Sequence, residues 1–245
     1  TKRVQFGYAS EPFSLVDHRL EGGVPVELQE EAQAGPGIDL SSNAVQRVQN
    51  TMALEREYAA GQLARDASKY PASNKETLSG TSQWSNPASD PFTDIMEGKE
   101  VIRSKTGEKP NVLTLGPKVL TALRTHPKVL DRLTTSTDRP PATIQQLQAL
   151  FELQQVVEGE AVYHDGTQFQ DVWGKDAILA YTTPASMQEM GSPNFGYTYQ
   201  LAGRPMVEEG YFDNNTNTWY FPTTDAYQPV FAGPAAGFLF TDAAA

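Results

Sequence analysis

The stretch that decides the fold runs from residue 84 to residue 133, WSNPASDPFTDIMEGKEVIRSKTGEKPNVLTLGPKVLTALRTHPKVLDRL. It predicts a helix from Pro91, because Asp90 can cap this helix and a proline at the first position needs no amide hydrogen. Gly107 supplies a stop, and Pro110 forbids continuation. The apolar residues that fall on one face of this helix are Phe92, Ile95, Met96 and Ile102.

A strand and a second helix are predicted directly after this turn. Residues 112–115 form an apolar run of the length of a buried strand. Pro117 opens a helix whose apolar side chains are Val119, Leu120 and Leu123. The order helix, turn, buried strand, helix predicts a fold that mixes helices and a sheet.

A long helix is predicted over residues 38–67. Asp39, Ser41 and Asn43 are each credible N-caps, and Asn43 with Gln46 resembles a capping box. About 26 residues would span roughly 40 Å. In residues 1–37, β-forming segments flank Glu21-Gly22-Gly23, which we expect to be a hairpin or loop tip. This segment has little to bury against nearby in the sequence, so we expect it to pack on something else, with a neighbouring subunit as one candidate.

The rest of the chain reads mainly as loops and strands. Residues 68–90 and 134–142 are rich in loop-forming residues, and Thr143 caps a predicted helix to Phe151. Strands are predicted in VVEGEAVY, DAILAYTT and FGYTYQL, and YFDNNTNTWYF predicts a hairpin that turns at Asn214 and Asn215. The tail VFAGPAAGFLF predicts a final buried strand.

Trp84, the Asp90-Pro91 helix start, TGEKPNVLTLG and VLTALRTHPKVLDRL together resemble the central region of tailed-phage major capsid proteins. The resemblance implies an α+β HK97-like capsid fold with an extended β-hairpin (the E-loop), a long spine helix, a peripheral domain and an axial domain. On this pattern residues 1–37 are the N-terminal segment and E-loop, and 38–90 the spine helix and peripheral domain. Residues 91–205 are then the axial domain, and 206–245 the peripheral-domain hairpin and C-terminal strand.

The composition of the 245 residues excludes several classes of protein. The net charge of −11 argues against a protein whose main task is to grip nucleic acid, yet it suits the wall of a DNA-filled shell. The chain has no cysteine, which rules out disulfides and zinc–sulfur sites, and no apolar run long enough to suggest a membrane span.

Catalytic and metal-binding patterns are missing from the sequence. TGEKP at 106–110 matches a zinc-finger linker, but without cysteines we interpret it as a helix end and turn. His126 before Pro127 predicts a structural hinge, and His164-Asp165-Gly166 a turn. The run 213–217 superficially suggests a calcium loop but lacks the required glycine and closing glutamate. We therefore expect no enzyme activity, no cofactor and no metal.

Aromatic residues near both ends of the chain predict contacts between subunits, because a monomer would struggle to cover them. The residues that we expect at the interface are Phe6, Tyr8, Phe13, Leu15, Arg19, Arg47, Arg56 and Trp219. Some capsid proteins cross-link through an E-loop lysine. Residues 4–36 contain no lysine, so we expect no such bond here.

The resemblance implies a structural protein that assembles as hexamers and pentamers into an icosahedral phage head around double-stranded DNA. The implied partners are many copies of the chain, weakly held DNA, and portal, scaffold and decoration proteins, with no membrane. The implied location is the virion, after assembly in the host cytoplasm. An encapsulin-type nanocompartment shell with the same fold, a decoration protein, and an α+β enzyme of small molecules are the alternatives.

Overall fold

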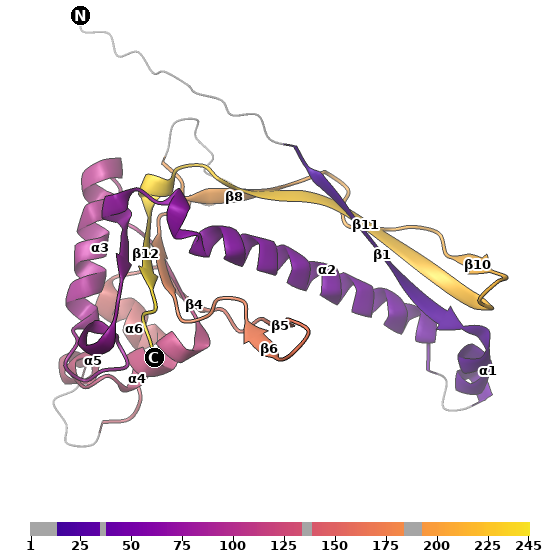
Figure 1. Ribbon diagram of the computed structural model, residues 1–245, viewed down its shortest axis with the longest axis horizontal. Coiled ribbons are helices and arrows are strands. Elements are labelled where there is room, and N and C mark those ends of the chain that lie inside the picture. Colours follow the sequence, from indigo (N-terminus) through magenta and orange to yellow (C-terminus); the bar gives the residue numbers. More distant parts are fainter. Residues whose placement is uncertain (1–13, 35–37, 134–138, 184–192) are drawn as a thin grey trace, which may run out of the picture. The chain divides into compact units, whose positions relative to one another are not determined.

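The computed structural model describes residues 14–34, 38–133, 139–183 and 193–245, which form two compact units. Of the described residues, unit 1 contains those within Ala60–Tyr197 and Phe231–Ala245, and unit 2 contains those within Ser10–Ala59 and Thr198–Val230. Figure 1 shows that each unit combines stretches that lie far apart in the sequence.

Unit 1 is built on a five-stranded mixed sheet. Its strands, in spatial order, are β2 (Lys75–Thr77), β12 (Gly237–Thr241), β7 (Ala177–Ala180), β3 (Val112–Leu115) and β4 (Gln155–Glu158). β7 is antiparallel to both of its neighbours, whereas the outer pairs are parallel. The strands predicted at 112–115, in DAILAYTT and in the tail are confirmed, and all four residues of β7 are buried because it is the central strand.

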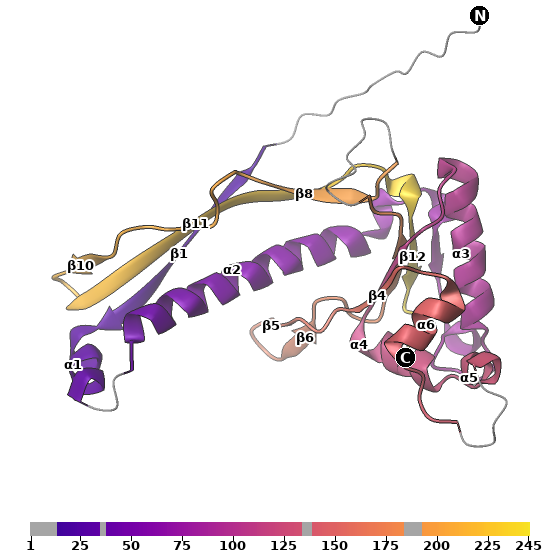
Figure 2. The same cartoon turned by 180° about the vertical axis from the view of Figure 1, so that it is seen from behind.

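Helix α3 (Pro91–Thr106) begins and ends where its capping residues predict. The Asp90 carboxylate accepts a hydrogen bond from the Thr93 amide at 3.3 Å, and Pro91 is the first helical residue. Gly107 adopts a left-handed conformation with φ 79° and donates its amide to the Arg103 carbonyl. Figures 1 and 2 show α3 running alongside β12.

Three shorter helices complete unit 1: α4 (Pro117–Thr125), α5 (Pro127–Leu133) and α6 (Ile144–Phe151). The predicted start of α6 is confirmed, because Thr143 and Gln146 form a capping box. His126, for which a structural hinge is predicted, is buried between α4 and α5. The residue is 2% exposed, and its Nε2 lies 3.1 Å from both the Ser89 hydroxyl and the Asn86 carbonyl.

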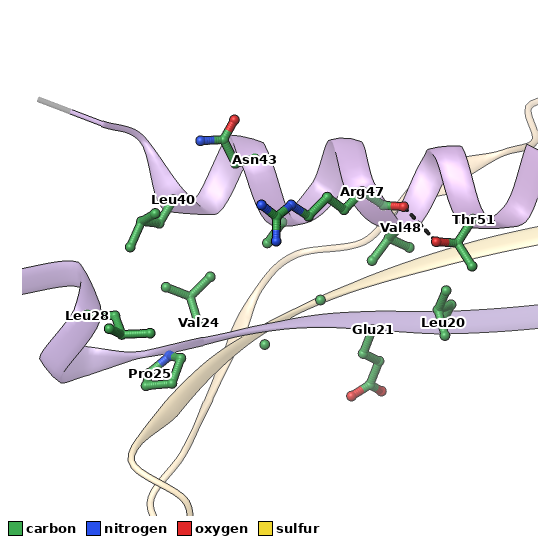
Figure 3. A pocket seen from close by; sticks show the side chains of 13 residues that line it. Leu20, Glu21, Val24, Pro25, Leu28, Leu40, Asn43, Arg47, Val48 and Thr51 are labelled. Atoms are coloured by element: carbon green, nitrogen blue, oxygen red, sulfur yellow. Dashed lines mark hydrogen bonds between the residues drawn. The ribbon is translucent and has the colours of Figure 1, made fainter. Parts of the chain in front are cut away.

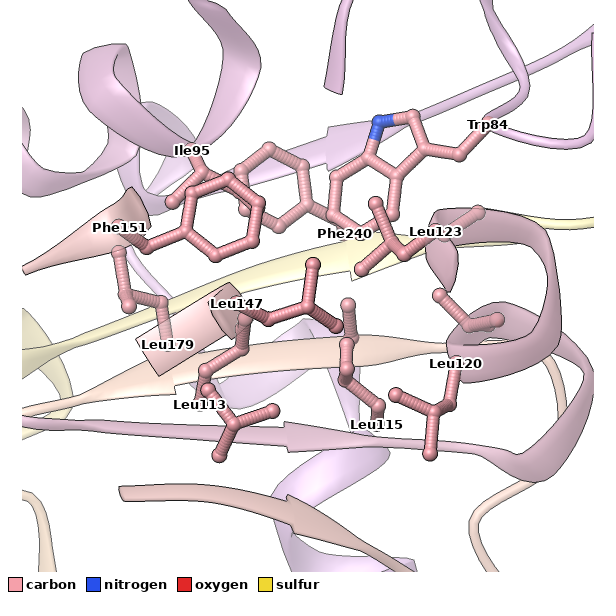
Figure 4. Packing of buried hydrophobic residues seen from close by; sticks show 14 of the residues in the cluster. Trp84, Ile95, Leu113, Leu115, Leu120, Leu123, Leu147, Phe151, Leu179 and Phe240 are labelled. Carbon is pink, nitrogen blue, oxygen red and sulfur yellow. The ribbon is translucent and has the colours of Figure 1, made fainter. Parts of the chain in front are cut away.

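The hydrophobic core of unit 1 lies between these helices and the sheet (Figure 4). Trp84 is fully buried, its ring centroid lies 5.1 Å from that of Phe240, and its indole nitrogen donates to Asp94 at 2.8 Å. Burying each large apolar side chain stabilises the fold by about 1.5–3 kcal/mol. The largest other fully buried members of this core are Ile95, Ile102, Leu113, Leu115, Leu120, Leu123, Leu147, Phe151 and Leu179.

The segment predicted as a loop over 68–90 is mostly irregular but includes short regular elements. It contains β2 and the short 3₁₀ turns Ala72–Asn74 and Gly80–Ser82, and a similar turn precedes it at Ala67–Lys69. Asn74 is fully buried, and its amide nitrogen donates to the carbonyls of Ala235 and Gly237. This side chain therefore fixes the loop to the chain that enters β12.

Unit 2 is organised around β11 (Thr218–Phe231). This strand pairs along its length with β1 (Val16–Pro25), and with β8 (Gly196–Gln200), β9 (Met206–Val207) and β10 (Tyr211–Asp213). The predicted hairpin is confirmed, since β10 and β11 are joined by a turn that includes Asn214 and Asn215. Asp213 stabilises this turn by accepting the Asn215 amide at 2.9 Å.

Two local predictions in unit 2 are wrong. Glu21-Gly22-Gly23 is no hairpin tip but the interior of β1, because the partner of this strand is β11, about 200 positions away in the sequence. The segment after it forms helix α1 (Val26–Ala34) rather than a strand.

The long helix predicted over 38–67 is confirmed as α2 (Leu40–Arg65), and Asp39, one of the three predicted N-caps, caps it. Only the predicted capping box of Asn43 and Gln46 does not form. Asp39 accepts the amides of Ser41 and Ser42, whereas Gln46 bonds to Asn50 instead of closing a box on Asn43.

A separate two-stranded ribbon in unit 1 consists of β5 (Val162–His164) and β6 (Phe169–Asp171). The turn predicted at His164-Asp165-Gly166 joins these strands and is confirmed. Asp165 accepts the amides of Thr167 and Gln168, both at 2.8 Å, which explains why an acidic residue occupies this turn.

Candidate subunit interface

In unit 2, strand β1 lies directly against helix α2, and Gly22 permits this close approach. A Cβ atom at Gly22 would lie 3.1 Å from both the Ala44 carbonyl oxygen and a methyl group of Val48. Because side chains alternate along a strand, the even-numbered residues of β1 face α2 and the odd-numbered ones face away.

A second contact holds this part of unit 2 together at His18. The ring of His18 stacks on Tyr227 of β11, with centroids 4.3 Å apart, and its Nδ1 lies 2.9 Å from a carboxylate oxygen of Glu55. Burial raises the pKa of Tyr227 to about 12, and the charge of Glu55 adds to this shift. The stack and the hydrogen bond therefore join β1, β11 and α2.

An apolar groove of about 350 Å³ lies between β1, α1 and the first half of α2 (Figure 3). We call it the β1–α2 groove. Val24 forms part of its buried floor, whereas Leu20 and Leu28 are 39% and 52% exposed. Leu40, Ala44 and Val48 line the helix side. Exposed leucines around a hollow are typical of a surface that another chain covers.

Arg47 is the cationic residue of this groove, and Figure 3 shows its side chain extended along it. It is exposed, and no carboxylate of the described residues forms an ion pair with it. The groove thus offers apolar surface and one available positive charge, which suits an apolar segment that carries an acidic group.

The structure brings only some of the predicted interface residues together. Arg47 lines the groove, and Trp219 lies opposite Val24 in the strand pairing. Arg19 is exposed on the odd-numbered face of β1, away from α2. Leu15 and Arg56 are both partly exposed, and the charge of Arg56 acts on Tyr227. The predictions for Phe6, Tyr8 and Phe13 fall outside the described residues.

Exposed apolar residues of unit 2 lie both in the aromatic hairpin, where the sequence predicts an aromatic surface near the end of the chain, and outside it. Phe212 packs on Trp219 with ring centroids 5.5 Å apart, and both remain more than one third exposed. Leu20 and Leu28 line the β1–α2 groove. They could not be predicted as interface residues, because the groove depends on helix α1, which the sequence did not predict. The further large apolar side chains of unit 2 with exposed surfaces are Val16, Ile38, Tyr199, Leu201, Met206, Val207 and Tyr211.

Two other kinds of site are absent from the residues that the structure describes. These residues contain no group of three or more histidine, aspartate or glutamate side chains placed to hold a metal ion. Among the helices of the same ranges, none combines the length and the apolar character needed to cross a membrane.

Comparison with known proteins agrees with the sequence pattern. Residues 67–219 match the family described as phage major capsid protein E. The major capsid protein of Burkholderia phage BcepMu is 31% identical over 234 residues, a match that covers 93% of this chain and 73% of the relative.

Solved structures give the same result for the fold. A phage-related protein from Bordetella bronchiseptica RB50 aligns with a TM-score of 0.83 and 40% identity, over 99% of this chain and 80% of that protein. The mature capsid of bacteriophage PhiM1 aligns with a TM-score of 0.55 and 12% identity, over 98% and 78% of the two chains, which shows the HK97-type fold.

The encapsulin alternative is not favoured. An encapsulin from Synechococcus elongatus shares only the fold, at 7% identity and a TM-score of 0.52 over 93% of this chain and 74% of that one, whereas the sequence relative above is a phage capsid protein. Together with the match over residues 67–219, this shows that the chain belongs to the phage major capsid protein E family, whose members build the shells of phage heads.

Proposed function

We propose that copies of this chain assemble as hexamers and pentamers into an icosahedral head that encloses double-stranded DNA. The observation that carries the proposal is the β1–α2 groove with its exposed leucines and available arginine. A free subunit would leave this apolar surface in water, and a neighbouring copy would cover it. Contacts that repeat from copy to copy close into rings when the rotation between copies allows.

The parts of the family pattern are proposed as follows. Residues 1–37 act as N-terminal segment and E-loop, 38–90 as spine helix and peripheral domain, 91–205 as axial domain, and 206–245 as peripheral hairpin and final strand. The 26 residues of α2 support the spine assignment. The pairing of β12 with β7 is evidence against one part of this assignment, because it joins the last strand to the segment proposed as the axial domain.

We further propose that all the predicted interface residues contact neighbouring copies, and that the protein is structural rather than catalytic. The net charge of −11 supports weak, non-specific contact with DNA, because a strongly basic wall would hold DNA and hinder its movement. Portal, scaffold and decoration proteins are the further proposed partners, and the host cytoplasm is the proposed place of assembly.

Charge substitutions in the groove test this proposal. Leu28→Asp and Arg47→Glu should yield folded subunits by circular dichroism, with roughly tenfold fewer particles by sedimentation and negative-stain microscopy. Ile38→Asp is the matched control, since Ile38 is 54% exposed, as much as Leu28, but does not line the groove. Wild-type particle yields from both groove variants would contradict the proposed role of the groove.

A further inference from the structure

The β5–β6 ribbon presents an apolar face that nothing in its own unit covers completely. Val162, His164, Phe169 and Asp171 share this face, because Val162 pairs with Asp171, His164 pairs with Phe169, and side chains alternate along each strand. Phe169 is 74% exposed, and its ring meets that of His164 edge-on, with the ring centroids 5.0 Å apart. Since two-stranded ribbons are marginally stable alone, an exposed phenylalanine here suits a docking contact.

The ribbon and the strand β4 that leads into it form an acidic segment. Residues 155–172 contain four acidic side chains, Glu158, Glu160, Asp165 and Asp171, and no lysine or arginine. Asp165 is engaged in the turn, but Glu160 is exposed and forms no ion pair within the described residues. The partner of this face should therefore combine an apolar hollow with positive charge.

Helices α4 and α5 provide the charge that the ribbon lacks. Residues 117–139 contain five basic and two acidic side chains, although the whole chain is acidic. Lys128 and Arg132 share one carboxylate, that of Asp90, at 3.8 and 3.4 Å. Lys118 is exposed, and among the described residues no carboxylate lies within ion-pair distance of it.

The same helices also provide a hollow. A cavity of about 380 Å³ opens beside Lys118. The residues of its wall include Trp84, Pro87, Thr121, Thr125 and Pro127. In Figures 1 and 2, α5 and the β5–β6 ribbon lie on opposite sides of β12.

The geometry points to a contact in which the β5–β6 ribbon of one copy docks on the α4–α5 surface of the next copy, with Phe169 in the hollow and Glu160 near Lys118. This inference rests on the proposed assembly of copies into a shell. The two surfaces differ and belong to the same unit, so the contact is head-to-tail and can repeat around a ring. Repulsion between like charges would also disfavour the contact of two acidic ribbons with each other.

Charge reversal in both surfaces tests the contact. In cells where the wild-type chain forms particles, Glu160→Lys and Lys118→Glu should each lower the particle yield roughly tenfold, and the double variant should recover most of it. Glu108→Lys and Lys109→Glu are matched controls, because both residues are exposed in unit 1 and lie outside the two surfaces. The controls should assemble normally.

Substitution of the aromatic residue gives an independent readout. Phe169→Ala should leave the melting temperature of the unassembled subunit unchanged, because the ring is mostly exposed, yet lower the particle yield roughly tenfold. Phe169→Tyr should assemble. Normal yields from Phe169→Ala and both charge reversals would overturn this contact alone. Failure of the wild-type chain to form particles under any condition would overturn the proposed shell function, and the contact with it.

Discussion

Replacing Trp84 by phenylalanine tests the account of the core of unit 1. The indole nitrogen donates to the Asp94 carboxylate at 2.8 Å, and the ring has no exposed surface. Losing a hydrogen bond to a charged, partly buried acceptor costs about 1–3 kcal/mol. The missing ring atoms leave space against Phe240, which adds about 1 kcal/mol. We therefore expect Trp84→Phe to lower the free energy of unfolding by about 2–4 kcal/mol.

The assay is urea unfolding of unassembled subunits, followed by far-ultraviolet circular dichroism at pH 7. Trp219→Phe is the matched control, because Trp219 is 38% exposed and this change should cost less than about 0.5 kcal/mol. Asp94→Ala should cost less in the Trp84→Phe background than in the wild-type chain, with a coupling of about 1–2 kcal/mol. If the two costs simply add, the hydrogen bond does not stabilise the core and the reasoning is refuted.

Three further outcomes are expected in unit 1. Burial raises the pKa of Asp94, so the ionised carboxylate lowers the stability of the fold at pH 7. Asp94→Asn should therefore raise the melting temperature at pH 7. This gain should vanish below pH about 4, where the wild-type carboxyl is protonated in both the folded and the unfolded chain. An unchanged or larger gain at acidic pH would show that charge is not the cause. Gly116→Ala should prevent folding, because its Cβ would lie 2.0 Å from the Gly174 carbonyl oxygen, so a soluble variant with a wild-type melting temperature would be evidence against this packing. Lys99→Met should lower the free energy of unfolding by about 1–2 kcal/mol, since the ammonium donates to the buried Phe151 carbonyl at 2.6 Å; equal stability in urea would contradict it.

Where local chemistry determines the structure, the sequence was sufficient. Asp90, Pro91 and Gly107 set the ends of α3 through hydrogen bonds to residues a few positions away, and Thr143 does the same for α6. The hairpin turn at Asn214 follows from side-chain bonds within the turn. Such interactions act over one turn of chain and do not depend on tertiary contacts.

Predictions failed where the partner is distant in sequence. Gly22 looked like a turn residue, but it is glycine because β1 approaches α2, and β1 pairs with a strand about 200 residues away. The β1–α2 groove could not be predicted for the same reason, although Arg47 was expected at an interface on charge alone. Phe169 gave only a weak signal, an aromatic residue in an acidic segment without lysine or arginine.

Cryo-electron microscopy of purified particles, combined with their A260/A280 ratio, tests the central claim most directly. We expect uniform icosahedral shells of hexamers and pentamers, and for filled heads an A260/A280 ratio typical of particles that contain nucleic acid. The map would also fix the triangulation number and show whether the β5–β6 ribbon meets the α4–α5 surface of the next copy. Monodisperse monomers or small oligomers across salt and protein concentration, with scaffold protein present, would contradict it.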